Sequence, residues 1–249
     1  MTTNEPPVGP TPEEPTENPP APPPAAGEFA AASGAPYSAS AAIGYGFDKF
    51  KANPGPWILA LLIFVGVSVA LGLVTIPFTP EADPLDNPFG FTFEPVSFII
   101  NIILTAVGYI FSAVLVRGAL DETQGAKFSI GSAFSRLNLG PVILLGLLLS
   151  IGSTIGILLC VLPGIVFAFL TMFALVFLVD QDLNPIEAIT ASFKLCVEKL
   201  GESILTALLA LLVVVLGFLA CCIGLIVAVP VTQIAIAYAY KQLRGVPVA

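Results

Sequence analysis

The sequence contains no histidine among its 249 residues, and only 10% of its residues are charged. A soluble domain usually carries about 25% charged residues. The absence of histidine removes the most common catalytic base and metal ligand, and the side chain that ordinarily titrates near neutral pH. No Ser/His/Asp set, glycine-rich phosphate loop or other nucleotide-binding motif is present. We therefore predict a protein that is not an enzyme and binds no metal or cofactor.

Positive charge is also scarce, with nine Lys and Arg against 17 Asp and Glu, for a net charge of −8. The first 48 residues contain no Lys or Arg at all. Because no basic patch is available to neutralise a phosphate backbone, nucleic acid is excluded as a partner. No apolar core follows Met1, so the first hydrophobic segment is predicted to be a retained membrane anchor and not a cleaved signal.

Residues 1–40 hold 11 of the 23 prolines, together with several glutamates. Such a segment buries too little apolar surface to offset its ordering entropy, so we predict a disordered, acidic, cytoplasmic tail. Pro7–Pro10 and Pro12–Pro15 have PxxP spacing. Two interpretations stay open: a solvated, stiffened tail, which we favour, or a polyproline II segment that binds a protein partner.

Long apolar runs make up most of the remaining chain, which is 56% hydrophobic overall. About 20 apolar residues cross a bilayer. The runs 141–179 and 204–240 are too long for one crossing, and Leu162-Pro163-Gly164 and Cys222-Ile223-Gly224 interrupt them. We therefore predict an all-α, polytopic membrane domain over residues 41–245. Its six transmembrane helices form three hairpins and cover residues 57–76, 96–116, 141–160, 163–179, 204–221 and 224–240.

The positions of the basic residues predict the orientation, because Lys and Arg gather on the cytoplasmic side of a membrane protein. All nine lie at the two ends of the six-helix domain or in alternate connections: Lys49, Lys51, Arg117, Lys127, Arg136, Lys194, Lys199, Lys241 and Arg244. The other three connections contain none. We therefore expect both termini in the cytoplasm.

Three amphipathic segments are predicted to lie on the cytoplasmic membrane surface: residues 41–53, 128–137 and 185–199. The third has the clearest start, because Asn184 suits the N-cap, Pro185 the first helical position and Glu187 a capping box. Its apolar stripe is predicted to comprise Ile186, Ile189, Phe193, Cys196 and Leu200.

None of the six predicted span cores contains a charged side chain, and the main polar exceptions are Asn101 and Gln233. Each is a candidate for contact with a polar lipid head group. The interpretation that we favour is an interhelical hydrogen bond, worth about 0.6 kcal/mol. Gly152–Gly156 forms a GxxxG motif, which we expect to serve packing within the chain. The oligomeric state is left open.

Cys160, Cys221 and Cys222 fall near the outer ends of predicted spans, and Cys196 lies on the segment 185–199. A disulfide between Cys160 and Cys221 or Cys222 is one possibility, and free thiols are the one that we favour. Asp180 and Asp182 are expected to end a span, stay in water and favour the N-terminus of the next helix.

Four sequence phrases carry a resemblance to a known group of proteins: GYGFDKFKANPGPWILALL, LPGI at Leu162–Ile165, VDQDLNPIEAITAS at Val179–Ser192 and AYAYKQLRG at Ala237–Gly245. They are similar to uncharacterised bacterial six-helix membrane proteins. That group includes the non-catalytic membrane domain beside some glycerophosphodiester phosphodiesterases. The proline-rich head resembles the proline- and glycine-rich transmembrane proteins of actinobacteria. The resemblance implies a bacterial plasma-membrane protein and brings no active residues with it.

Two functions fit these observations. The first is a non-enzymatic scaffold or accessory subunit of a membrane or envelope complex, with membrane lipids around it and a protein partner on its proline-rich tail. The alternative is a transporter or flippase of a lipid-like substrate, which the glycine- and proline-interrupted spans favour.

Overall fold

The computed structural model describes residues 37–76, 95–220 and 224–249, and all regular secondary structure in these ranges is helical. The all-α prediction is confirmed for this part of the chain. The described helices are α1 Ala39–Ala52, α2 Pro54–Thr75, α3 Pro95–Thr123, α4 Ile130–Ser135, α5 Leu139–Leu159, α6 Val161–Leu170, α7 Ala174–Gln181, α8 Pro185–Glu198, α9 Leu200–Leu219 and α10 Leu225–Leu243. Residues 1–36 of the predicted disordered tail lie outside the described residues, and its end is corrected by α1, which begins at Ala39 after the N-cap Ser38.

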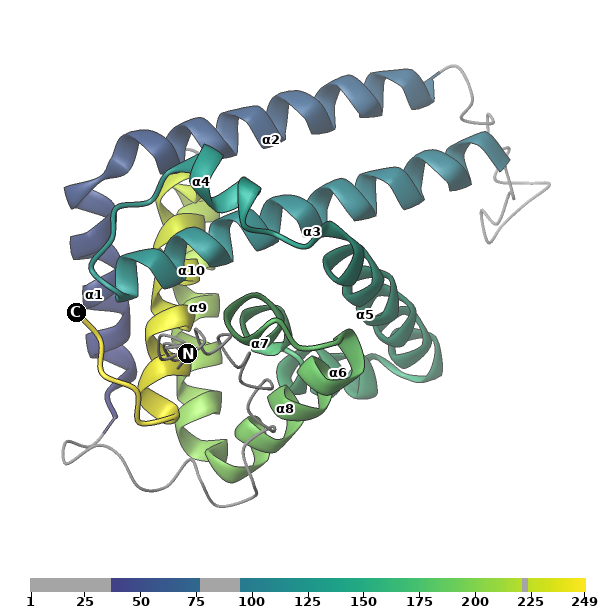
Figure 1. Cartoon of the computed structure of the whole chain (residues 1–249). Helices are drawn as coiled ribbons and strands as arrows, with labels where there is room; N and C mark the ends of the chain where they lie inside the picture. The colour runs from purple at the N-terminus through teal and green to yellow at the C-terminus, as the bar shows by residue number, and fades with distance from the viewer. Residues whose placement is uncertain (1–36, 77–94, 221–223) are drawn as a thin grey trace, which may run out of the picture.

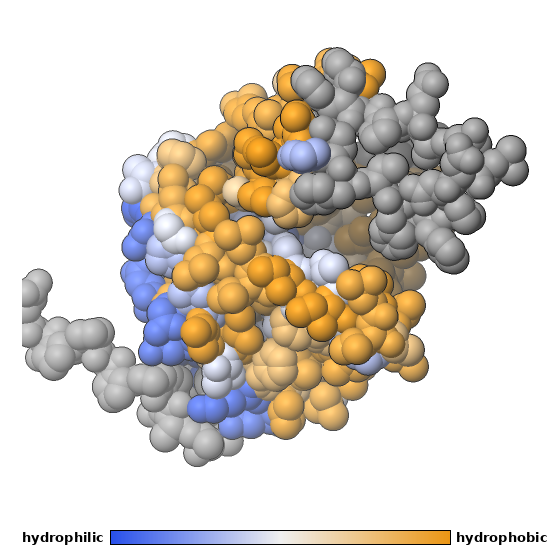
Figure 2. Space-filling view, turned by 90° about the vertical axis from the view of Figure 1, so that its right-hand side faces the viewer, coloured by the Kyte–Doolittle hydropathy of each residue, from blue (hydrophilic) through white to orange (hydrophobic). Residues whose placement is uncertain are grey.

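Within the described ranges, five segments are long and apolar enough to cross a membrane: Pro54–Val74, Phe98–Thr123, Leu139–Leu159, Val161–Gln181 and Leu200–Leu219. At most 39% of the most apolar part of each is buried inside the protein. Figure 2 shows that hydrophobic residues cover much of the visible face, with hydrophilic residues along one edge. Apolar surface of this extent is typical of helices surrounded by lipid.

α10 covers the predicted sixth span, residues 224–240, but is not among these five segments. Eleven of its residues are buried, and it packs against α1, α3 and α9. It also contains Pro230, Gln233 and Lys241, which make it less apolar. Because other helices surround α10, its polar side chains find partners within the protein, as Lys241 does with Asp180.

Consecutive long helices pack against each other: α2 against α3, α5 against α6, and α9 against α10. In Figure 1, α2 and α3 run side by side, while α10 crosses α3 steeply. The three pairs are therefore not parallel members of one regular bundle.

α1 packs lengthwise against α10 and α9, although the sequence predicts a helix that lies at the membrane surface. Its buried face carries Ala39, Ala42 and Gly46, whose small size allows close approach. Near its start, the Tyr37 hydroxyl lies 2.5 Å from the Thr206 hydroxyl of α9. Toward its end, Phe47 lines a cavity with Gly217 and Gly224. α1 is therefore antiparallel to α10 and parallel to α9.

α5 ends at Leu159 and α6 begins at Val161, with Cys160 in an extended conformation between them. The turn thus precedes the predicted breaker, and Pro163 lies in the first turn of α6, where a proline is tolerated. A Cβ on Gly156 would lie 2.8 Å from Cα of Gly164, and one on Gly152 would lie 2.5 Å from the Phe167 ring. The GxxxG motif therefore packs against α6 within the same chain, as predicted.

Candidate functional site

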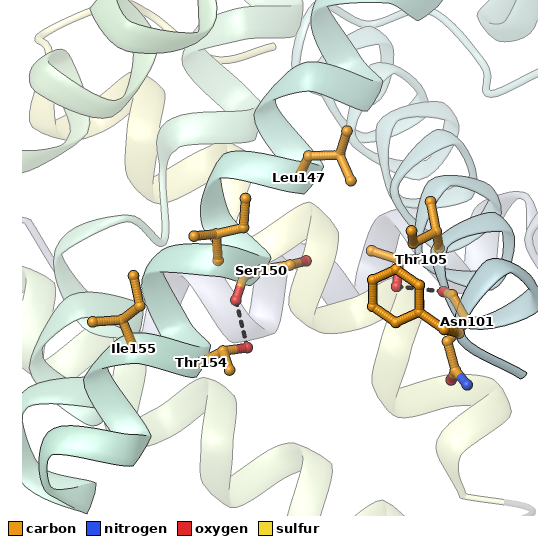
Figure 3. Close-up of a pocket in the computed structure, with 9 residues that line it drawn as sticks. Asn101, Thr105, Leu147, Ser150, Thr154 and Ile155 are labelled. Carbon is orange, nitrogen blue, oxygen red and sulfur yellow. Dashed lines mark hydrogen bonds between the residues drawn. The ribbon is translucent and has the colours of Figure 1, made fainter. Parts of the chain in front are cut away.

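A cavity of about 410 Å³ lies between α3 and α5, and the predicted contact residue Asn101 lines it. We call this space the α3–α5 groove. Figure 3 shows the labelled side chains of the two helices on opposite sides of the space. The lining residues are Phe98, Asn101, Ile102 and Thr105 from α3, and Leu147, Ser150, Ile151, Thr154 and Ile155 from α5. The volume is within the range of about 300–1,000 Å³ that is typical of small-molecule sites.

The apolar walls of the groove are open to the surroundings of the helices. Ile102 is 42% exposed, Ile151 is 57% exposed and Ile155 is 52% exposed. All three lie within segments that are apolar enough to cross a membrane. In a bilayer, an apolar molecule would therefore reach the groove directly from the lipid layer, because these residues form no polar barrier.

Polar side chains form a row on each of the two helices. Asn101 and Thr105 are four residues apart on α3, as are Ser150 and Thr154 on α5, so each pair shares one helix face. The Thr105 hydroxyl donates to the Asn101 carbonyl at 2.8 Å, and the Thr154 hydroxyl donates to the Ser150 carbonyl at 2.8 Å. Each threonine thus uses its one proton within its own helix and keeps lone pairs that accept hydrogen bonds.

Tyr109 of α3 contacts Gly146 of α5 next to residues that line the groove. Tyr109 lies four residues, about one helical turn, after Thr105 on α3, and Gly146 directly precedes Leu147 on α5. A Cβ on Gly146 would lie 2.5 Å from the Tyr109 ring. Glycine at position 146 therefore allows the ring to lie directly against the α5 backbone, where the two helices approach closely.

The second predicted contact residue, Gln233, is half-buried on α10 and is not among the described residues that line the groove. The structure therefore does not bring Asn101 and Gln233 together. Thr105, Ser150 and Thr154 line the groove but were not singled out in the sequence. The spacing of four between polar residues on each helix is the signal that points to them, once α3 and α5 are known to face each other.

The described ion pairs gather where α3, α7 and α10 end, and we call the six residues that form them the charged junction. Asp180 pairs with Lys241 at 2.7 Å and with Arg244 at 3.4 Å, and it also accepts a hydrogen bond from Tyr240 at 2.8 Å. Asp121 pairs with Arg117 and Arg136. The Arg117 guanidinium donates to the Val179 carbonyl at 3.1 Å, which connects the two sets.

The expectation that Asp180 stays in water is wrong. Its side chain is only 10% exposed, and the side chain of its partner Lys241 is 9% exposed. Asp180 lies in the last turn of α7 and faces the end of α10, so it binds the two cations there. Asp182 is exposed and ends α7 in the left-handed conformation, with φ of 50°. The expected exposure therefore holds for Asp182 alone.

The predicted capping box is present at the start of α8. The Asn184 side chain accepts from the Glu187 backbone N–H at 3.0 Å, and Glu187 accepts from the Asn184 backbone N–H at 3.3 Å. In the predicted apolar stripe, Cys196 is buried against the protein and Ile186 is 69% exposed, so contact of the stripe with a membrane surface stays a prediction. The buried residues of α8 are Pro185, Ala188, Ser192, Leu195 and Cys196.

The buried face of α8 covers a break between α6 and α7 at residues 171–173. The Ser192 hydroxyl donates to the Leu170 carbonyl at 2.7 Å and accepts from the Phe173 N–H at 3.2 Å. The Cys196 thiol approaches the Phe169 carbonyl at 3.6 Å. A broken apolar helix leaves backbone groups that need partners, and α8 supplies them.

Cys160 is an exposed free thiol at the turn between α5 and α6. Its proposed partners, Cys221 and Cys222, lie outside the described residues. Cys196 is a buried free thiol on α8.

Burial raises the pKa of Cys196 to about 11. A free cysteine has a pKa near 8.5, so Cys196 should hold far less reactive thiolate at pH 8. We expect Cys196 in the folded protein to react with iodoacetamide at least about tenfold more slowly at pH 8 than after unfolding. Mass spectrometry of the peptide would measure both rates. Equal rates would show that Cys196 is not held in the buried site.

The exposed apolar helices define an all-helical protein of membrane type. The chain is 30% identical over 225 residues to the uncharacterized protein Rv2560 of Mycobacterium tuberculosis strain H37Rv, and the match covers 84% of this chain and 69% of the relative. The uncharacterized protein Mb2590 of Mycobacterium bovis matches to the same extent. The chain therefore belongs to the same family as these mycobacterial proteins. No family model matches it, and no solved structure matches it significantly.

Proposed function

We propose that the protein is a non-enzymatic integral protein of the bacterial plasma membrane, with six transmembrane helices in three hairpins and both termini in the cytoplasm. The alternation of basic and non-basic connections supports this orientation. The charged junction adds support, because it joins residues 117–136, 180 and 241–244. These belong to three regions that the charge pattern assigns to the cytoplasmic side.

α10 is included as the sixth span because its two ends lie far apart. Lys241 and Arg244 lie in the charged junction. At the other end, Gly224 packs against Gly217 near the end of α9. The low hydropathy of α10 agrees with a span that other helices surround.

Within this topology, the function that we propose is to bind and transfer a lipid-like molecule through the α3–α5 groove. One observation supports this function: the groove combines exposed apolar walls with a row of polar side chains. Both lie on helices that are apolar enough to span a membrane. An amphiphilic molecule needs both surfaces, because its chains avoid polar groups and its head group needs hydrogen-bond partners. The groove thus favours the transporter or flippase hypothesis.

Filling the groove tests this function. We expect Ile151→Trp to lower the amount of bound lipid about tenfold, because the indole would occupy the space between α3 and α5. The measurement is native mass spectrometry of protein released from nanodiscs. Leu144→Trp is the matched control, since Leu144 is also on α5, is 51% exposed and is not among the lining residues. Equal lipid retention in both variants would contradict lipid binding at this groove.

The scaffold hypothesis is the second candidate, and the proline-rich composition of residues 1–40 favours it. These residues lie almost wholly outside the described part of the chain. A pull-down in mild detergent with and without residues 1–36 tests this role. We expect a defined partner that is lost with the tail if the protein is a scaffold, and the same partners in both samples if it is not.

A further inference from the structure

We propose that the ligand of the α3–α5 groove is an uncharged lipid whose head group carries hydroxyl groups, such as a diacylglycerol, and not an anionic phospholipid. This inference rests on the lipid-binding function proposed above and adds the chemistry of the head group.

The first argument is the distribution of charge. None of the nine described residues that line the groove is charged. The four cations of the charged junction are not among the described lining residues, and each already pairs with Asp121 or Asp180. A phosphate or carboxylate is bound by cations or by several N–H donors. Among the described lining side chains, only the Asn101 amide has an N–H group.

The second argument is the direction of the hydrogen bonds. The Thr105 and Thr154 hydroxyls donate their protons to backbone carbonyls of their own helices. Their oxygens therefore face a ligand mainly as acceptors. A hydroxyl group on the ligand donates to such an oxygen, whereas an ionised phosphate is itself an acceptor and is repelled by it. The threonines thus complement a hydroxylated head group.

The third argument is depth. At 1.5 Å per residue, Asn101 and Thr105 lie about 9–15 Å along α3 from its start at Pro95. Thr154 lies about 8 Å from the end of α5 at Leu159. In the proposed topology the polar row lies within the hydrocarbon layer. A charged head group is costly at that depth, and an uncharged hydroxyl group costs less.

Photo-crosslinking of the full chain in nanodiscs tests the inference. The probes are a diacylglycerol and a phosphatidylglycerol with identical photoreactive acyl chains. The variant is the double substitution Thr105→Val and Thr154→Val, which removes both acceptors and keeps the shape of the side chains. Thr190→Val on α8 is the matched control, because the Thr190 hydroxyl donates to the Ile186 carbonyl at 2.8 Å with the same spacing but outside the groove. Circular dichroism verifies that every variant stays helical.

We expect the diacylglycerol to label α3 and α5 peptides, with apparent affinity about tenfold lower in the double variant and unchanged in the control. Phosphatidylglycerol should label these peptides less. Equal labelling by both lipids, with no effect of the double variant, would overturn the inference and leave lipid binding intact. Labelling of α3 and α5 by neither lipid would overturn the proposed function itself. Ser150→Ala gives a second measurement, with a smaller loss of diacylglycerol labelling expected.

Discussion

Replacing Asp180 with asparagine is expected to destabilise the folded protein by about 3–5 kcal/mol, because it leaves two cations without their carboxylate. Lys241 and Arg244 are mostly buried, and both pair with Asp180. Their charges would then be held at the α7–α10 contact with little solvent to stabilise them. The free energy of unfolding can be compared by denaturant titration in detergent, followed by circular dichroism.

Asp182→Asn is the matched control for this prediction. It removes the same charge two residues away, at an exposed position with φ of 50°, a conformation that asparagine tolerates well. We expect its effect to stay within about 0.5 kcal/mol. Similar losses in the two variants would mean that net charge, and not the buried pairing of Asp180, determines the result.

Gly46→Ala is expected to cost about 1–3 kcal/mol, because α1 and α10 touch at this glycine. The added Cβ would lie 2.5 Å from the Val231 backbone carbonyl oxygen. A backbone carbonyl within a helix cannot rotate away, so the two helices must separate. The thermal midpoint of unfolding in detergent should fall accordingly.

Gly44→Ala on the same helix should have the opposite sign. A Cβ at Gly44 meets nothing within 4 Å. Alanine is favoured over glycine in a helix interior by about 0.5–1 kcal/mol, so this variant should be slightly more stable than the natural protein. If both substitutions stabilise the protein, the close packing of α1 on α10 is incorrect.

The elements that follow from local rules were predictable from the sequence. Apolar length located α2, α3, α5 and α9, because a helix in lipid must be apolar along its whole length. The capping box of α8 was predictable because it involves residues three apart, Asn184 and Glu187. The turn after α5 was placed within three residues of Cys160, since proline and glycine restrict the local backbone.

The parts that depend on long-range packing were not predictable. The protein-facing side of α8 was not predictable, because it is determined by the broken α6–α7 backbone, with which the Ser192 hydroxyl forms hydrogen bonds. The burial of Asp180 depends on Lys241, which is 61 residues away. In the candidate site, Asn101 was identifiable as a polar residue in an apolar run. Thr105, Ser150 and Thr154 could be identified as lining residues only from the structure, which shows that α3 faces α5.

The central claim is that the basic segments share the cytoplasmic face, with the turn between α5 and α6 on the other side. Cysteine accessibility in intact cells tests it most directly. Each variant would carry one cysteine, either native Cys160 or an exposed replacement, Lys127→Cys or Lys194→Cys, with the other native cysteines changed to alanine. We expect a membrane-impermeant maleimide to label Cys160 in intact cells, and to label the other two variants only after lysis. Labelling of Lys194→Cys in intact cells would place α8 outside and contradict the account, because residues 141–179 would then cross the membrane only once.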